Sequence, residues 1–317
     1  MKLTTPVDIS PSEILVGPED RIFSIGSCFA QELARILSLG ELQVLSNPYG
    51  TLFSPCAIER ALRRIRNADL YTEKDLIIYE NYYISLDHHS SFDSPYLANT
   101  LENINAKIEN SHSFLRGTQW VIITLGTSWI YEFLPQGRGV SNCRKIPQRF
   151  FSRRLLGAEE IYLALENSIL HIQAICPENV QLLFTVSPVR HSKEGMIENQ
   201  RSKSLLISVL HEVIEPLQYC HYIPVYEIMM DELRGYRFYK EDMIHPSTQS
   251  ISYIFEKFSK AYFSEDTDEF VKENLKIHQA FSHKPKDKND FAHQAFLDKI
   301  QRRIKVQQQK VKHKIFL

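Results

Sequence analysis

The first strand-like segment and the turn after it read Arg21-Ile22-Phe23-Ser24-Ile25-Gly26-Ser27-Cys28-Phe29-Ala30. The apolar run predicts a short buried strand that ends at Gly26. Apolar residues then recur at helical spacing from residue 29 to 37, which predicts a helix directly after the turn. The turn therefore places two nucleophilic side chains, Ser27 and Cys28, at the N-terminus of a helix.

The same alternation of strand and helix continues to about residue 265. Further strands are predicted at 42–45, 120–125, 180–186 and 222–226, a hairpin at 76–86, and helices at 55–66, 96–115, 158–176, 193–215 and 247–264. Continuous apolar strands are typical of parallel sheets that helices cover on both faces. We therefore expect a doubly wound α/β fold, a three-layer α/β/α sandwich with a parallel sheet. Such folds carry their sites at the carboxyl ends of strands.

The composition indicates a globular protein of 317 residues with a net charge of -1. No apolar run approaches the roughly 20 residues of a membrane span, and the N-terminus lacks an apolar signal core. We expect a cytoplasmic protein with no membrane partner. The five cysteines form no CxxC pair, and no phosphate-binding or dinucleotide-binding glycine motif occurs, so we expect no metal and no cofactor.

The C-terminal segment differs in charge from the rest of the chain. From His283 onward it contains ten Lys or Arg and three Asp residues. We divide the chain into an α/β domain at 1–265 and a basic, helical extension at 266–317, with a linker at 284–288 and a helix at 291–315. The extension is either an arm for an acidic partner or oligomer contact, or a solvated helix docked on the domain. We favour the docked helix and expect no nucleic-acid partner; the oligomeric state stays open.

A second motif, Asp242-Met243-Ile244-His245-Pro246, precedes the last helix of the α/β unit. One loop can then supply a histidine base and a carboxylate that orients it, as nucleophilic catalysis requires. The exposed N–H groups at a helix N-terminus favour a thiolate, so we expect a lowered pKa for Cys28. The alternative is that Ser27 is an ordinary helix cap and Cys28 a packed thiol.

Five motifs together resemble the GSCFA domain family, which is similar to the SGNH/GDSL hydrolases. They are Ile25-Gly26-Ser27-Cys28-Phe29-Ala30, Asn47-Pro48-Tyr49-Gly50-Thr51, Leu125-Gly126-Thr127-Ser128-Trp129, Asn142-Cys143-Arg144-Lys145-Ile146-Pro147 and Asp242-Met243-Ile244-His245-Pro246. The resemblance covers roughly residues 20–260. It implies an SGNH-like fold with its site around the first turn.

The resemblance implies catalytic roles for Cys28 or Ser27, His245 and Asp242. Aligning on Gly26 puts Cys28 at the nucleophile position, whereas aligning on the serine selects Ser27. We favour Cys28 because the glycine is the geometrically constrained residue, and we keep Ser27 open. His245 would be the base and Asp242 its orienting carboxylate.

The resemblance also implies an oxyanion hole. Gly50 fits its second element, and Gly126 fits the third, with Ser128 where the related enzymes have an asparagine. Asn142 is an alternative donor from a following hairpin. From their positions beside the predicted strand ends, we expect further substrate contacts from three side chains, Tyr49, His89 and Arg190.

Two functions follow as hypotheses. The first is an acyl-ester or thioester hydrolase or acyltransferase that acts on a small-molecule or saccharide acyl substrate. The second is a catalytically silent SGNH-like binding module for a polar ligand or partner. The relative position of His245 and the two nucleophile candidates, Cys28 and Ser27, distinguishes these functions.

Overall fold

The central feature of the computed structural model, which describes residues 5–281 and 291–317, is a five-stranded sheet. All its strands are parallel, in the order β2 (Gln43–Ser46), β1 (Arg21–Gly26), β5 (Trp120–Leu125), β9 (Gln181–Val186) and β10 (Cys220–Tyr222). The chain passes from β1 to β2 on one side and then to β5 on the other. Binding crevices of such sheets form at this reversal, outside the carboxyl ends of the strands.

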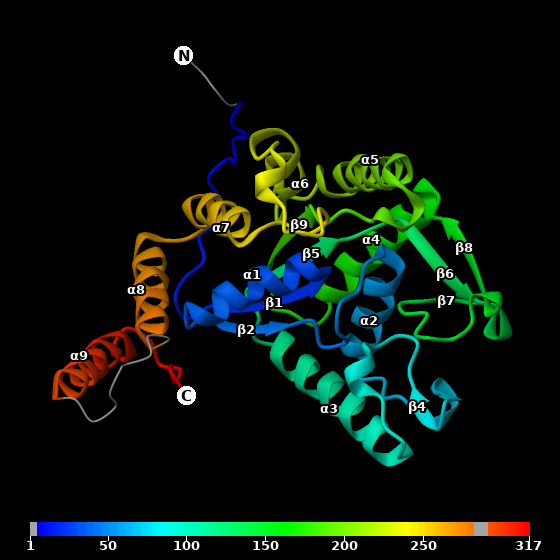
Figure 1. Ribbon diagram of the computed structural model, residues 1–317, viewed down its shortest axis with the longest axis horizontal. Coiled ribbons are helices and arrows are strands. Elements are labelled where there is room, and N and C mark those ends of the chain that lie inside the picture. Colours follow the sequence, from blue (N-terminus) through cyan, green and yellow to red (C-terminus); the bar gives the residue numbers. More distant parts are fainter. Residues whose placement is uncertain (1–4, 282–290) are drawn as a thin grey trace.

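Helices cover both faces of the sheet, because alternate residues of each strand point to opposite sides. One apolar core contains Phe23 and Ile123 and packs against α2 (Pro55–Asn67), α3 (Leu97–Leu115), α4 (Ala158–Gln173) and α5 (Met196–Ile214). The other contains Ile22 and Ile122 and packs against α1 (Cys28–Leu39), α6 (Val225–Glu227) and α7 (Thr248–Tyr262). The predicted three-layer α/β/α fold is confirmed, and Figure 1 shows its arrangement.

The last strand of the sheet was predicted at residues 222–226, and this prediction is wrong. β10 covers Cys220–Tyr222 and the chain then turns into α6. Ile223 still donates its N–H to the Phe184 carbonyl at 2.8 Å. Pro224 has no N–H to donate, so the ladder ends there.

Two small antiparallel sheets project from the sandwich. The first is the predicted hairpin, formed by β3 (Ile77–Tyr79) and β4 (Tyr82–Ile84). The second lies between β5 and α4 in the sequence and has the order β7 (Arg138–Val140), β6 (Trp129–Phe133) and β8 (Phe151–Leu155). Both contribute to a small third apolar core.

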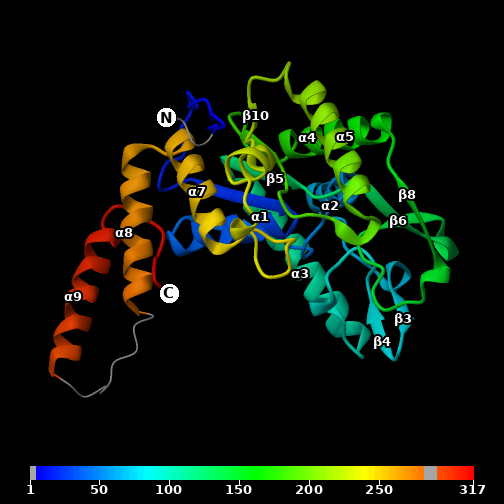
Figure 2. The ribbon, with the colours of Figure 1, turned by 45° about the horizontal axis from the view of Figure 1, so that its top comes forward.

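The C-terminal segment forms α8 (Glu265–Phe281) and α9 (Phe291–Gln308), which lie side by side in Figures 1 and 2. Asn274 of α8 donates to the Gly40 carbonyl at the end of α1, at 3.0 Å. The predicted linker at 284–288 lies outside the described residues. Within residues 5–281 and 291–317, no helix is both long and apolar enough to cross a membrane.

Candidate active site

The turn after β1 depends on its glycine. Gly26 has φ = +140°, and a Cβ at this position would lie 2.2 Å from the Thr124 carbonyl oxygen. Ser27 donates its N–H to that same oxygen at 3.1 Å, and Gly26 donates its N–H to Asn47 Oδ1 at 2.8 Å. Only glycine lets β1 turn this close to β5. The turn also lies at the reversal point of the sheet, because β1 is paired with β2 on one side and β5 on the other.

The two nucleophile candidates have different surroundings. Ser27 is the N-cap of α1 and is 1% exposed, and its Oγ accepts the Phe29 N–H at 3.3 Å. Cys28 is the first residue of α1 and is only partly buried. The serine therefore caps the helix, and the thiol is the group that reaches the surface hollows of the turn.

Cys28 lies between two hollows. The first has a volume of about 330 Å³ and is lined by Cys28, Gln31, Glu32, Arg35, Lys240, Asp242 and His245. The second has a volume of about 530 Å³ and is lined by Cys28, Gln31, Leu45, Ser46, Asn47, Pro48, Gly50, Thr51, His89, Ser91, Phe92 and Lys107. The fold thus brings Cys28 and the Asp242–His245 pair, which are more than 200 residues apart in sequence, to one hollow.

Asp242 and His245 form a locally closed pair. His245 Nδ1 lies 2.7 Å from Asp242 Oδ2, and Asp242 Oδ1 accepts the N–H groups of Ile244 and His245, both at 2.9 Å. These bonds, the backbone ones first, lower the pKa of Asp242 to about 2. The ionised carboxylate can only accept, so in the neutral ring Nδ1 carries the proton and Nε2 is an acceptor.

Arg190 holds the loop that carries this pair. It donates its backbone N–H to the Ile244 carbonyl at 3.2 Å, and its Nη1 donates to the Met243 carbonyl at 3.3 Å. The guanidinium also lies 4.0 Å from the centre of the Tyr239 ring. Arg190 lines neither hollow, and its observed contacts hold the loop between Asp242 and His245.

The expected lowering of the Cys28 pKa is wrong. Burial raises the pKa of the thiol, and this effect outweighs the lowering by its own backbone N–H. Glu32 raises the pKa further, whereas Lys240 lowers it. Because the thiol keeps its proton at neutral pH, a reaction at Cys28 requires a base.

Gly50 belongs to the second hollow, as expected, but its N–H is already engaged. It donates to the Asn47 carbonyl at 2.8 Å. Gly50 has φ = +81°, and a Cβ here would lie 2.3 Å from the Cβ of His89. Among the described residues no hydrogen bond involves the N–H of Thr51, which lines the same hollow. The sequence pattern singled out Gly50 and missed Thr51.

The third predicted oxyanion element is engaged elsewhere. Gly126 donates its N–H to the Phe53 carbonyl at 2.8 Å. Ser128 is fully buried, and its Oγ lies 3.0 Å from Ser202 Oγ. Neither Gly126 nor Ser128 lines a hollow with Cys28.

Two further predicted contacts stabilise the loop before α3. Asn142 donates its side-chain amide to the His88 carbonyl at 3.1 Å. Tyr49 is 1% exposed and stacks on the His88 ring at 4.1 Å. Of this group only the neighbouring His89 reaches the second hollow. Asn142 and Tyr49 do not line the hollow; both contact His88, the residue before His89.

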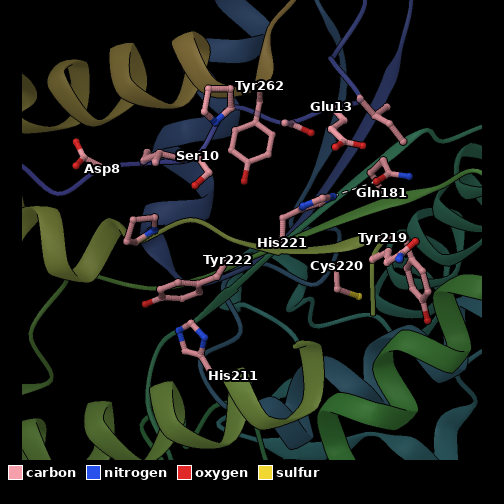
Figure 3. Close-up of a pocket in the computed structure, with 16 residues that line it drawn as sticks. Asp8, Ser10, Glu13, Gln181, His211, Tyr219, Cys220, His221, Tyr222 and Tyr262 are labelled. Carbon is pink, nitrogen blue, oxygen red and sulfur yellow. Dashed lines mark hydrogen bonds between the residues drawn. The ribbon is translucent and has the colours of Figure 1, made fainter. Parts of the chain in front are cut away.

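A third hollow, of about 1030 Å³, lies elsewhere, along β10 and the N-terminal segment (Figure 3). Burial raises the pKa of its cysteine, Cys220, to about 12. His221 Nε2 lies 3.1 Å from Gln181 Oε1, and Tyr222 donates its hydroxyl to Glu227. Among its described lining residues no histidine pairs with a carboxylate as His245 does with Asp242, so this hollow offers less chemistry than the smaller ones around Cys28.

Fold and site together define an α/β/α protein with a cysteine, a histidine and an aspartate around one hollow at the carboxyl edge of its sheet. The chain belongs to the GSCFA family, whose model matches residues 21–258. This match confirms the resemblance that the five motifs indicated.

Two solved structures are similar at low identity. A DUF4886 family protein from Bacteroides uniformis has 12% identity and a TM-score of 0.43, over 90% of this chain and 95% of that one. A carbohydrate esterase family 2 enzyme with a carbohydrate-binding domain, from Corynascus thermopiles (Myceliophthora fergusii), has 12% identity and a TM-score of 0.39, over 81% and 67%. No curated protein matches the chain. At these TM-scores the similarities carry no functional argument.

Proposed function

We propose that this protein is an acyl-transferring enzyme of SGNH-like type, a hydrolase or acyltransferase that acts on an ester or thioester. Cys28 is the nucleophile, His245 the base and Asp242 the carboxylate that orients the base. One observation carries the proposal: Cys28 lines the same hollow as the Asp242–His245 pair. The capping role of Ser27 supports Cys28 over Ser27.

The proposed reaction has two steps. In the first, His245 Nε2 takes the thiol proton while the Cys28 sulfur attacks the acyl carbon. The bond to the leaving oxygen or sulfur breaks, and the leaving group receives the proton from His245. In the second step His245 deprotonates water or an acceptor hydroxyl, which attacks the thioester and restores the thiol. The raised pKa of Cys28 makes the base essential to the first step.

The oxyanion donors that fit this site are the backbone N–H groups of Cys28 and Thr51. The Cys28 N–H lies at the start of α1, and Thr51 lines the second hollow beside the thiol. Each such donor contributes typically about 10²–10³ in rate. Gly50 supplies the conformation that brings Thr51 to the hollow, rather than an N–H of its own.

The second hollow supports a polar acyl substrate, such as a small molecule or a saccharide. Its lining combines the polar side chains of Asn47, His89 and Ser91 with the ring of Phe92. Apolar surface with a few placed polar groups is typical of small-molecule sites. Lys107 is the single charged side chain in this lining.

The proposal is tested by intact-mass and peptide-mapping spectrometry after incubation with a small activated acyl ester. We expect an adduct on Cys28 that neutral hydroxylamine removes, as it does a thioester. Cys28→Ala should abolish this adduct and Ser27→Ala should retain it. His245→Ala should slow its formation by roughly 10²–10⁴-fold, the usual contribution of a general base.

Two outcomes would contradict the proposal. If Cys28 were acylated at an equal rate in wild type and His245→Ala, His245 would not be the base. Absence of any Cys28 adduct with several donors, in a protein that still binds them, would favour the silent binding module instead.

A further inference from the structure

A buried lysine lies behind the site. Lys203, on the apolar face of α5, is 1% exposed. Its Nζ donates to the Gly126 carbonyl at 2.6 Å and to the Ser187 carbonyl at 2.7 Å, the first residues after β5 and β9. No ion pair in the described part of the chain involves Lys203, and burial lowers its pKa to about 7. Burial of an amino group costs free energy unless hydrogen bonds compensate for the lost hydration, and these two bonds supply that compensation.

The first bond leads to the nucleophile. Gly126 and Thr127 both donate their N–H groups to the Phe53 carbonyl, at 2.8 and 3.0 Å. One residue earlier, Leu52 donates its N–H to the Gly26 carbonyl at 2.9 Å. The Gly126 carbonyl therefore sets the position of the segment 51–53, and this segment bonds directly to the turn that carries Cys28.

The second bond leads to the base. Ser187 begins a short segment in which its Oγ accepts the Val189 N–H at 3.3 Å. The next residue, Arg190, donates to the carbonyls of Ile244 and Met243 in the loop between Asp242 and His245. The position of the Ser187 carbonyl therefore influences the position of the imidazole.

We propose that Lys203 is a positioning residue that couples the two halves of the site. By holding the carbonyls of Gly126 and Ser187 to one nitrogen, it sets the separation between Cys28 and the Asp242–His245 pair. Lys203 lines neither hollow and does not touch the reacting atoms. The catalytic meaning of this coupling rests on the function proposed above.

The test is a double-mutant cycle on the alkylation rate of Cys28 by iodoacetamide, followed by peptide mapping at neutral pH. His245→Ala is introduced into wild type and into Lys203→Met, which keeps an unbranched side chain one atom shorter and removes its donors. We expect the effect of His245→Ala to shrink about fivefold in the Lys203→Met background, within the range for residues of one network. Lys203→Gln, which keeps N–H donors, should restore part of the effect.

Alkylation of Cys143, which lines neither hollow, serves as the internal control. A lower melting temperature of Lys203→Met alone would indicate a structural role. It would not alter the ratio of alkylation rates from which the cycle is calculated. An equal effect of His245→Ala in both folded backgrounds would overturn the proposal. If Lys203→Met does not fold, Lys203→Leu, which also removes the donors, carries the same comparison.

Hydrogen exchange separates this proposal from the proposed function. If His245→Ala leaves Cys28 alkylation unchanged in wild type, the proposed catalytic pair fails, but Lys203 is still tested. The hydrogen-bonded amides of Leu52 and of residues 243–245 should exchange roughly tenfold faster in Lys203→Met, as for a local loss of stability. Amides of the β3–β4 hairpin should keep their rates. Unchanged exchange at both segments would reject the positioning role.

Discussion

Asp242 Oδ2 lies 2.7 Å from His245 Nδ1, and the other oxygen of this carboxylate accepts two backbone N–H groups of the same loop. An aspartate can bond the backbone two and three residues ahead because its side chain is short. The same turn therefore orders the loop, keeps the carboxylate ionised and aligns the ring. The pair remains open to solvent, with side-chain exposures of 39% for His245 and 44% for Asp242.

Asp242→Asn should slow acylation of Cys28 by about 10²-fold or more, because the ring loses the charge that fixes its tautomer and stabilises its protonated form. The measurement is the rate of adduct formation by mass spectrometry. Glu241→Gln removes the neighbouring exposed carboxylate and should label like wild type. Wild-type labelling of Asp242→Asn would contradict the assigned role.

Gly50→Ala should destabilise the protein by roughly 1–3 kcal/mol and disturb the second hollow, since the new Cβ meets both a positive φ and the Cβ of His89. Urea unfolding and Cys28 labelling measure the two effects. Gly137→Ala is the matched control, because Gly137 also has a positive φ but no atom lies within 4 Å of the added Cβ. Equal losses of stability in both variants would contradict a steric role for His89.

Lys203 should make stability depend on pH. In the unfolded chain a lysine keeps its proton up to about pH 10, whereas burial lowers the folded pKa of Lys203 to about 7. Between these values the unfolded state binds more protons, so wild-type stability should rise with pH relative to Lys203→Met. The slope is at most about 1.4 kcal/mol per pH unit.

Urea unfolding of both proteins at several pH values from 7.5 to 10 measures this slope. In that window the nearby His191 is neutral, because burial lowers its pKa from the ordinary value. Lys260→Met, which removes an exposed lysine of α7, is the control for the loss of one lysine. A constant difference between wild type and Lys203→Met would rule out a neutral buried amine.

Lys107→Glu should reduce alkylation of Cys28 by iodoacetate relative to the uncharged iodoacetamide. Lys107 is the single charged side chain lining the second hollow, so its reversal repels an anionic reagent. We expect a change of roughly threefold in the ratio of the two rates at low salt, and less at high salt. Lys260→Glu is the control. An unchanged ratio of the iodoacetate and iodoacetamide rates would show that the charge of Lys107 does not act on Cys28.

The fold was predictable because its three central strands, β1, β5 and β9, are mainly apolar runs that end at or just before glycine or serine. The strand at 222–226 was predicted wrongly because the apolar residues continue past Pro224. Proline has no N–H to donate to the neighbouring strand, so the strand ends before it. The family was predictable because its motifs are specific, and the Asp242–His245 pair because its geometry is local. The catalytic roles of Cys28, His245 and Asp242 stay predictions.

Other site features depended on long-range packing. Ser128 and Asn142 are polar residues near predicted strand ends, but their partners, Ser202 and the His88 carbonyl, come from distant segments. The role of Lys203 was not predicted from the sequence, although buried residues recur around it at helical spacing in α5. This helical spacing of apolar residues is the signal in the sequence that predicts a lysine on the buried face of α5.

The sequence by itself determined the turn at Gly26, the order of strand and helix, and the loop that joins Asp242 to His245, because these depend on neighbouring residues. Only the tertiary structure decided that Cys28 shares a hollow with that loop and that Ser27 is enclosed as a cap. It also decided that burial raises the pKa of Cys28, whereas the helix N-terminus alone predicts the opposite. Desolvation depends on every segment packed around the thiol, and no local pattern contains that information.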